Sequence, residues 1–352
     1  MYKPKIKKLR FKGAVLHKLN TNLKLKKISI SEVLQKNQYL IKLKYSGICG
    51  SQIGEIRGVK GKDKYLPHLL GHEGSGIVVD KNSNSEKIKI GDRVVLHWKP
   101  GKGKDAKVPK YLDNKKKTIN AGKVTTFNSY AVVSENRITK LNPTTNLSYA
   151  CLLGCSLTTA FGVLKNNARI KKGSDVIIYG AGAVGQSIIC LSKLFYLNNI
   201  IAIDISKEKL KKAKSLGATH TFTPTEFELF LNQNSFVKKI QFAVDTTGNT
   251  KVIEFCYNNL SPKCKIILVG VPHYKKKIEI HTLPLHFGKQ LIGSHGGNIQ
   301  PSKDIPYLEN LINKKKINES NLIQKTIKLD KINSYINKMK KNLIVSKIII
   351  SF

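Results

Sequence analysis

Apolar and polar positions follow two different patterns along the chain, which changes character near residue 156. Up to that point, short apolar runs are bounded by Gly, Pro, Asn and Asp, a pattern typical of strands joined by turns. The strands are predicted at Lys12–Leu16, Tyr39–Tyr45, Gly76–Asp80, Asp92–Leu96 and Ser129–Ser134. We therefore expect an irregular, mostly β domain, with the lysine-rich segment 98–118 as a loop or lobe on it.

From about residue 160, apolar strands alternate with helical stretches. The strands are predicted at Asp175–Tyr179, Ile200–Ile203, Phe242–Asp245 and Lys265–Val269, and one of the helices at Ala183–Phe195. Such alternation implies βαβ units and a parallel sheet with helices on both faces. After residue 297 the pattern predicts two amphipathic helices, around 305–312 and 332–339, and a last strand at 347–352. The fold class is therefore α/β, with two domains.

The composition is that of an ordinary globular enzyme, with 41% hydrophobic and 24% charged residues in a chain of 352. No apolar run approaches the roughly 20 residues of a membrane span. The basic start of the chain lacks the apolar stretch of a signal peptide, so we expect a cytoplasmic protein without a membrane partner. Six scattered cysteines do not form a disulfide framework, and reduced thiols are expected.

The net charge of +40 raises the question of nucleic-acid binding. Only five of the 62 basic residues are arginine, whereas recognition of bases and phosphates depends heavily on the bidentate guanidinium group. The excess of lysine favours a general surface charge over a specific nucleic-acid interface. This charge is expected to raise solubility and to attract anionic ligands.

A glycine-rich motif indicates a dinucleotide site. Gly180, Gly182 and Gly185 form GxGxxG directly after the strand Asp175–Tyr179 and at the start of a helix, the context that gives the motif meaning. The helix N-terminus offers N–H groups to a pyrophosphate. Asp204 follows 19 residues after the last glycine, where its carboxylate can bind ribose hydroxyls and repel the 2′-phosphate of NADP. NAD is therefore predicted, with a plain turn and a helix cap at Asp204 as the alternative.

Three further residues are candidates for contact with the cofactor. Val184 lies inside the glycine motif, and Val269 ends a later strand of the same sheet. Lys209 follows Asp204 closely and could contact the same ribose. In so lysine-rich a chain, the alternative is an ordinary surface lysine at position 209.

One histidine and two cysteines stand in glycine-containing segments. His72 lies between a proline-containing turn and the strand Gly76–Asp80, Cys49 stands in GICGS, and Cys155 follows Leu-Gly. Taken alone, His72 would more often be a structural histidine than a ligand. Thiolates and imidazoles are preferred ligands of zinc, so the three residues together form a candidate metal site.

The segments YSGICGS, LLGHEGSG, GDRVV, LLGCSLTTAFG, GAGAVG and IAID occur in the order found in zinc-containing medium-chain alcohol dehydrogenases, which the chain resembles over residues 12–352. The resemblance implies a GroES-like catalytic domain, 1–156 completed by 297–352, and a Rossmann NAD-binding domain, 157–296. It implies one catalytic zinc held by Cys49, His72 and Cys155, the last favoured over Cys151 by the match to LLGC. It also implies hydride transfer between an alcohol and NAD.

The resemblance assigns roles to four more residues. Ser51 resembles the hydroxyl that takes the alcohol's proton. Glu73 resembles the acidic residue behind the zinc, with partnership to a local lysine as the alternative. Trp98 falls where the family has an aromatic wall of the substrate pocket, or else it is packed core. Lys347 matches a basic residue that contacts the pyrophosphate, or else it is a surface lysine.

The chain departs from the family pattern in three places. The lobe after GDRVV has no cysteine, so we expect no structural zinc. Gly54 stands where many members carry a relay histidine, and Gln52 replaces an acidic residue. The stretch between Cys49 and His72 is slightly longer than in liver-type members. The substrate therefore stays open among primary alcohols, polyols, cyclitols and sugar derivatives.

Two other functions stay open on the sequence. One is a non-catalytic dinucleotide-binding protein whose lysines bind nucleic acid or an acidic membrane, and the other is a zinc-free reductase of the same fold. The presence of Cys49, His72 and Cys155 together argues against both, because neither function needs these three ligands. The family resemblance implies a homodimer or a homotetramer.

Overall fold

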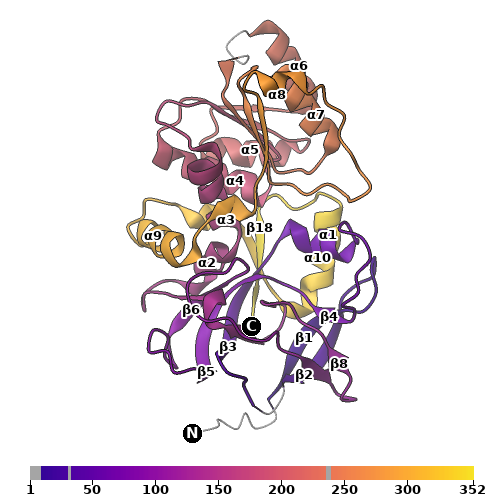
Figure 1. Ribbon diagram of the computed structural model, residues 1–352, viewed down its shortest axis with the longest axis vertical. Helices are drawn as coiled ribbons and strands as arrows, with labels where there is room; N and C mark the ends of the chain where they lie inside the picture. Colours follow the sequence, from indigo (N-terminus) through magenta and orange to yellow (C-terminus); the bar gives the residue numbers. More distant parts are fainter. Residues whose placement is uncertain (1–8, 31–32, 235–238) are drawn as a thin grey trace. The chain divides into compact units, whose positions relative to one another are not determined.

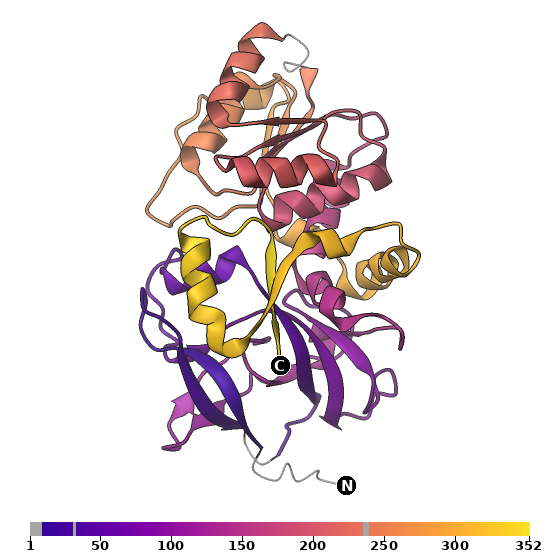
Figure 2. The ribbon, with the colours of Figure 1, turned by 180° about the vertical axis from the view of Figure 1, so that it is seen from behind.

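The computed structural model describes residues 9–30, 33–234 and 239–352, which form two compact units (Figures 1 and 2). The first unit comprises Met1–Thr158 and Gln300–Phe352, and the second comprises Thr159–Ile299. The domain limits predicted from the sequence, 156 and 297, lie within a few residues of these. The basic start of the chain, residues 1–8, lies outside the described residues.

The first unit contains two β-sheets with the strand orders β4-β1-β2-β7-β8 and β10-β6-β5-β3-β18-β17, and β9 pairs with β3. The bounds are β1 Arg10–Leu16, β2 Lys24–Ile30, β3 Gln38–Ile48, β4 His68–Leu69, β5 Glu73–Asn82, β6 Arg93–His97, β7 Tyr111–Asp113, β8 Thr118–Ile119, β9 Tyr130–Ser134 and β10 Ile138–Lys140. Because successive side chains of a strand point to opposite faces, β3 packs on both sides. Tyr39, Ile41 and Leu43 belong to one buried cluster, whereas Leu40 belongs to another.

The C-terminal segment completes the first unit. It contains α9 (Pro301–Asn313), β17 (Ile323–Lys328), α10 (Ile332–Lys340) and β18 (Lys347–Ser351), drawn in yellow and orange in Figure 2. Strand β18 pairs antiparallel with β3, with Ile348 opposite Ile48. Ile332 and Ile336 of α10 pack in the same buried cluster as these two residues. The end of the chain is therefore fixed beside the strand that leads into Cys49.

The second unit is built on a six-stranded parallel sheet (Figure 1) with the order β13-β12-β11-β14-β15-β16. The strands are β11 Val176–Tyr179, β12 Ile200–Ile203, β13 His220–Phe222, β14 Phe242–Asp245, β15 Lys265–Leu268 and β16 Gln290–Gly293; the helices are α4 Ala183–Ser192, α5 Lys207–Leu216, α6 Pro224–Gln233, α7 Thr250–Asn259 and α8 Leu283–His286. Counted from β11, the order is 3-2-1-4-5-6, that of a dinucleotide-binding Rossmann fold. All residues of β11 and β12 are buried, as expected of a covered parallel sheet. The predicted α/β fold class is confirmed.

The lobe at residues 98–118 is more ordered than its sequence indicates. Strand β7 pairs with β2 and with β8, so that a short hairpin closes around Lys115–Lys117. Strands of two or three residues are too short to give a periodic signal in the sequence. Among the described residues, no single helix is long and apolar enough to cross a membrane, and one pair of helices, Leu147–Gly154 with Ser156–Ala168, reaches that length only across a 50° bend.

Candidate functional site

Three predicted ligands converge in the first unit. Cys49 is the N-cap of α1 (Gly50–Ile56) directly after β3, and His72 lies between β4 and β5. Cys155 follows the 3₁₀ helix Cys151–Gly154. One ligand atom from each residue lies within 4.8 Å of the other two. In the part of the chain that the structure describes, this is the one such group of three metal-binding side chains.

Cys155 reaches the other two ligands because a glycine precedes it. A Cβ atom at position 154 would lie 2.4 Å from the carbonyl oxygen of Leu96 and 2.9 Å from Cα of Glu73. A side chain there would therefore push the 3₁₀ helix away from β5 and β6. Cys151 is buried and its Sγ donates to the carbonyl oxygen of Ser148 at 3.1 Å, so its thiol has another partner.

The donor atoms and their spacing fit zinc. In a tetrahedral site with Zn–S bonds of about 2.3 Å, two sulfur ligands lie about 3.8 Å apart. The separations here are no larger than 4.8 Å, so small side-chain movements suffice. Nε2 of His72 is buried and has no hydrogen-bond partner among the described residues. A buried polar atom is rarely left in this state, which supports a ligand at that nitrogen.

The protonation of the two ligand thiols is linked. Cys155 donates a hydrogen bond to Cys49, and this bond lowers the pKa of Cys49 well below its ordinary value. The same bond, together with burial, raises the pKa of Cys155 well above its ordinary value. A metal held by both sulfurs must displace the proton of Cys155, so metal affinity rises with pH.

Two residues contact the imidazole of His72. Gln52 is 1% exposed, and its side-chain amide lies 2.6 Å from Nδ1 of His72. For a metal to bind at Nε2, Nδ1 must carry the proton and donate it to the oxygen of the Gln52 amide. The centroid of the Trp98 ring lies 6.5 Å from that of the imidazole, so the predicted aromatic residue is a neighbour of the ligands.

A buried ion pair lies beside the ligands. Glu73, the first residue of β5, is 0% exposed, and its Oε1 accepts a hydrogen bond from Nζ of Lys347. Lys347 begins β18, next to Ile348, which pairs with Ile48, and therefore lies near Cys49. Burial alone would lower the pKa of Lys347, but negative charge beside it, above all that of Glu73, raises it above its ordinary value.

This pair differs from what the sequence predicted for either residue. The alternative of a surface lysine at 347 is wrong, because its side chain is 2% exposed. A buried carboxylate needs a cation, and β18 supplies Lys347 to Glu73. The lysine partner of Glu73 is not local, since 274 residues separate the two. A contact of Lys347 with the pyrophosphate stays a prediction.

The hydroxyl predicted to take the alcohol's proton is accessible. Ser51 is exposed in the first turn of α1, two residues after Cys49. The sequence of α1 is GSQIGEI, so this helix carries no imidazole that could receive the proton next. A role for Ser51 stays a prediction.

The glycine motif lies where β11 meets α4. Gly180 has a φ of +94°, which lets the chain turn at the end of β11. Gly182 is the N-cap of α4, and a Cβ atom there would meet no atom within 4 Å, whereas one at Gly185 would lie 2.0 Å from the carbonyl oxygen of Gly180. The chain thus leaves open space beside the N-terminus of α4, where unbonded N–H groups favour an anion.

Asp204 lies beside this turn. Its Oδ2 accepts the N–H of Ala181 at 2.8 Å and its Oδ1 accepts the N–H of Ser206 at 2.9 Å. The cap of α5 is Ser206, whose Oγ accepts the N–H of Lys209 at 3.4 Å. The alternative in which Asp204 caps that helix is therefore wrong, and the half-buried carboxylate stands next to the glycine turn.

The other predicted cofactor residues have the following places. Val184 is in the first turn of α4, and Lys209 in the first turn of α5. Val269 directly follows β15 and its N–H donates to the carbonyl oxygen of Asp245 at 2.8 Å. Val184 and Val269 thus lie beyond the carboxyl ends of β11 and β15. Ligands of open parallel sheets bind outside these ends of the strands. Contacts of all three residues with a cofactor stay predictions.

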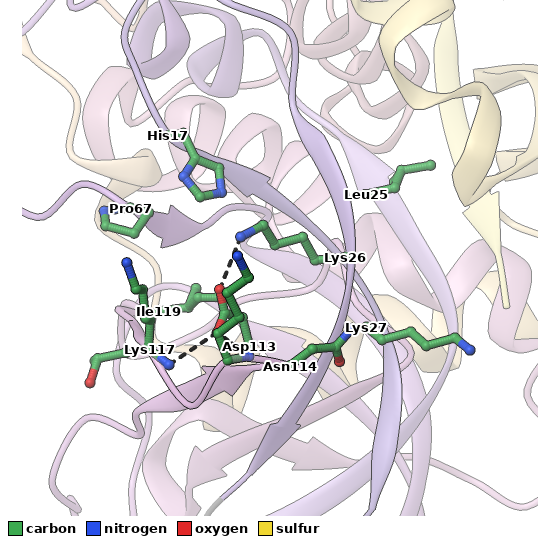
Figure 3. A pocket seen from close by; sticks show the side chains of 11 residues that line it. His17, Leu25, Lys26, Lys27, Pro67, Asp113, Asn114, Lys117 and Ile119 are labelled. Atoms are coloured by element: carbon green, nitrogen blue, oxygen red, sulfur yellow. Dashed lines mark hydrogen bonds and ion pairs between the residues drawn. The ribbon is translucent and has the colours of Figure 1, made fainter.

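A separate cavity of about 570 Å³ lies beside the lobe of the first unit (Figure 3). Asp113 lines it, lies 3.1 Å from Nζ of Lys26, and accepts the backbone N–H groups of Lys115 and Lys117. The one imidazole that lines it is His17, whose pKa is lowered by burial and by the charge of Lys26. A single imidazole and an already bonded carboxylate do not make a zinc donor set.

Two family models match the chain: the alcohol dehydrogenase GroES-like domain at residues 35–143 and the zinc-binding dehydrogenase domain at residues 183–314. Alcohol dehydrogenase 6 of Peromyscus maniculatus is 30% identical over 95% of this chain and 96% of that protein. S-(hydroxymethyl)glutathione dehydrogenase of Photobacterium damsela subsp. piscicida is 26% identical over 85% and 88%.

The solved structures agree with the sequence comparison. Benzyl alcohol dehydrogenase of Acinetobacter calcoaceticus superposes with a TM-score of 0.86 at 25% identity, over 98% of this chain and 99% of that one. The convergence of Cys49, His72 and Cys155 supplies the matching donor set. The chain therefore belongs to the zinc-containing alcohol dehydrogenases of the medium-chain dehydrogenase family, which are zinc-dependent oxidoreductases that act with NAD or NADP.

Proposed function

We propose that this protein oxidises a primary alcohol, polyol, cyclitol or sugar derivative with NAD. The observation that carries the proposal is the convergence of Cys49, His72 and Cys155, with Nε2 of His72 buried and unpartnered. A bound zinc would supply a Lewis acid for the alcohol's oxygen, and bound NAD would supply the hydride acceptor.

The chain's own residues have separate tasks in this reaction. Cys49, His72 and Cys155 would hold the zinc, while Gln52 orients the imidazole through its contact at Nδ1. Ser51 would accept the proton of the alcohol and release it to water, because its side chain is exposed. Trp98 would restrict the space beside His72 and so help to select the substrate.

The direct test is a panel of primary alcohols, polyols, cyclitols and sugar derivatives. Reduction of NAD by the zinc-loaded protein would be followed through the absorbance of NADH. Turnover of at least one class supports the proposal. Binding of NADH without turnover of any alcohol, aldehyde or ketone would overturn it in favour of a non-catalytic dinucleotide-binding protein.

We propose one zinc per chain. The lobe at residues 99–117 contains no cysteine or histidine, and its two acidic residues already have partners. Asp105 lies 2.7 Å from Nζ of Lys123, and Asp113 lies 3.1 Å from Nζ of Lys26. These ion pairs support the view that the lobe is stabilised by lysine and carboxylate where many family members use a second metal.

We propose NAD as the natural cofactor on the basis of Asp204, and the variant Asp204→Asn tests it. We expect kcat/KM for NAD to fall about 10- to 100-fold, because losing a hydrogen bond to a charged group costs about 1.5–3 kcal/mol. Use of NADP should rise relative to NAD, since the charge that repels the 2′-phosphate is gone. Initial rates with both cofactors measure the ratio.

The matched control for this variant is Asp175→Asn. Asp175 accepts bonds from Asn199 and stands just before β11, at the amino ends of the parallel strands, whereas Asp204 follows the carboxyl end of β12. The asparagine at 204 retains an oxygen for the N–H of Ala181, so the glycine turn should persist. An unchanged cofactor preference in Asp204→Asn would refute the assignment.

We propose that the chain forms a homodimer through β16, with a homotetramer as the next larger assembly. Strand β16 is an edge of the parallel sheet, and the segment before it exposes Leu283, Leu285 and Phe287, the last 70% exposed. An uncovered edge next to apolar side chains favours pairing with a second chain.

Phe287→Glu is expected to yield monomers in sedimentation velocity. The control, Leu229→Glu, changes an exposed residue of α6 and should sediment like the unmodified protein. If Phe287→Glu also sedimented like the unmodified protein, β16 would not be the interface.

A further inference from the structure

A cavity of about 630 Å³ in the first unit extends from the zinc ligand His72. Gln52, the buried neighbour of His72, also lines it. The volume is in the range of small-molecule sites, roughly 300–1,000 Å³. The cavity can therefore hold the part of a substrate that extends away from a hydroxyl placed at the ligands.

Lysines outnumber carboxylates around this cavity. Its lining contains Lys60, Lys62, Lys64 and Lys123, with Glu55 and Asp63 as the acidic residues. Lys123 is bonded to Asp105 at 2.7 Å, and Asp63 is bonded to Nε2 of His68 at 2.7 Å. Within the described ranges, Lys60, Lys62 and Lys64 form no ion pair with a carboxylate. Nζ of Lys64 lies 5.5 Å from the centroid of the Tyr65 ring, a contact that leaves its charge unneutralised.

The segment 58–65, which carries these three lysines, is held by its own bonds. The N–H of Gly61 donates to the carbonyl oxygen of Gly58 at 2.9 Å, and the N–H of Tyr65 donates to Asp63 at 2.9 Å. Nδ2 of Asn120 donates to the carbonyl oxygen of Tyr65 at 2.8 Å. A segment that is already ordered loses less conformational entropy when a ligand binds. The backbone that carries the three lysines is thus ordered beside the cavity before a ligand binds.

We infer that the alcohol substrate carries an anionic group, a phosphate or a carboxylate, which Lys60, Lys62 and Lys64 bind while the hydroxyl lies at His72. This inference rests on the proposed function. Ammonium groups bind phosphate as point charges, and three of them lining one concave site add their attractions. The three lysines are exposed, so salt is expected to weaken this attraction, because it screens charges within about 8 Å.

The test uses inorganic phosphate and acetate as inhibitors of whichever neutral alcohol the panel shows to be oxidised fastest, with chloride at equal ionic strength as reference. The cavity variant is Lys60→Gln/Lys62→Gln/Lys64→Gln. The control, Lys314→Gln/Lys315→Gln/Lys316→Gln, removes the same charge from an exposed cluster after α9. We expect phosphate or acetate to compete with the alcohol, and inhibition to weaken about tenfold or more in the cavity variant but not in the control.

Matched substrates distinguish the two anionic groups. Sorbitol is compared with sorbitol 6-phosphate, and 1,4-butanediol with 4-hydroxybutyrate. A higher kcat/KM for the phosphate identifies a phosphate site, and a higher value for the carboxylate identifies a carboxylate site.

Two results would overturn the inference while leaving the proposed function intact. One is turnover of neutral alcohols without competition by either anion. The other is equal weakening of inhibition in the cavity variant and in the control, which would show a general effect of net charge. If no alcohol is oxidised, the proposed function fails, and calorimetric titration of the zinc-loaded protein with inorganic phosphate decides the anion site by itself. Equal phosphate affinity in the unmodified protein and the cavity variant would then refute it.

Discussion

Replacing Cys49 with serine is expected to remove both the zinc and the activity. Cys49 supplies a thiolate within 4.8 Å of the other two ligand atoms, and serine cannot replace it as a soft ligand. Mutation of a residue that only hydrogen-bonds to a metal ligand typically lowers metal affinity roughly 10- to 100-fold. Loss of the ligand Cys49 itself should lower it by more. Loss of a Lewis acid worth about 4 kcal/mol slows turnover about 10³-fold. Metal analysis and NADH absorbance measure the two effects on the same samples.

The matched control is Cys151→Ser. This cysteine is buried close to Cys155 in sequence, but its thiol is bonded to the carbonyl oxygen of Ser148. The control should retain one zinc per chain and near-normal turnover. Equal activity of Cys49→Ser and the unmodified protein would overturn the zinc mechanism, and two equivalents of zinc in the unmodified protein would contradict the proposal of a single metal.

The variant Lys347→Met is expected to cause a large loss of stability. It leaves the carboxylate of Glu73 buried at 0% exposure without the ammonium group that pairs with it. Breaking a buried ion pair from one side costs about 3–5 kcal/mol, because the remaining charge is uncompensated. Urea unfolding of the zinc-loaded protein, followed by the fluorescence of the single tryptophan, Trp98, reports on the first unit, which contains both residues.

A double variant separates lost charge balance from lost packing. Glu73→Gln/Lys347→Met removes both charges, so most of the lost unfolding free energy should return. Lys325→Met provides a control on the exposed face of the neighbouring strand β17 and should change stability by less than about 0.5 kcal/mol. A loss below about 1 kcal/mol in Lys347→Met would show that the pair carries little of the unit's stability.

Much of the fold could be predicted from local patterns. The strand Ile200–Ile203 was predicted with the bounds that the structure shows, because four consecutive apolar residues before Asp204 are typical of a covered parallel strand. The hairpin of β7 and β8 could not be predicted in this way. Its two strands are too short to show a periodic pattern in the sequence. They are extended because β7 pairs with β2 and β8 pairs with β7.

The residues around the zinc ligands show the same division. The replacement of an acidic residue by Gln52 is visible in the sequence, but its contact with Nδ1 of His72 is not. The three lysines at 60, 62 and 64 are unremarkable in a chain with 62 basic residues. They acquire significance once the structure places them around a cavity that begins at His72.

The set of Cys49, His72 and Cys155 was identified from the sequence alone, as were the glycine motif and Asp204. These signals are local, because a few neighbouring residues encode a turn, a strand or a ligand segment. Only the tertiary structure decided which distant groups meet. Glu73 pairs with Lys347 across 274 residues, and the cavity that begins at His72 is lined by the lysines at 60, 62 and 64. Such contacts depend on strand register and packing, which bring together residues that are far apart in the chain. The local sequence around each residue does not indicate its partner.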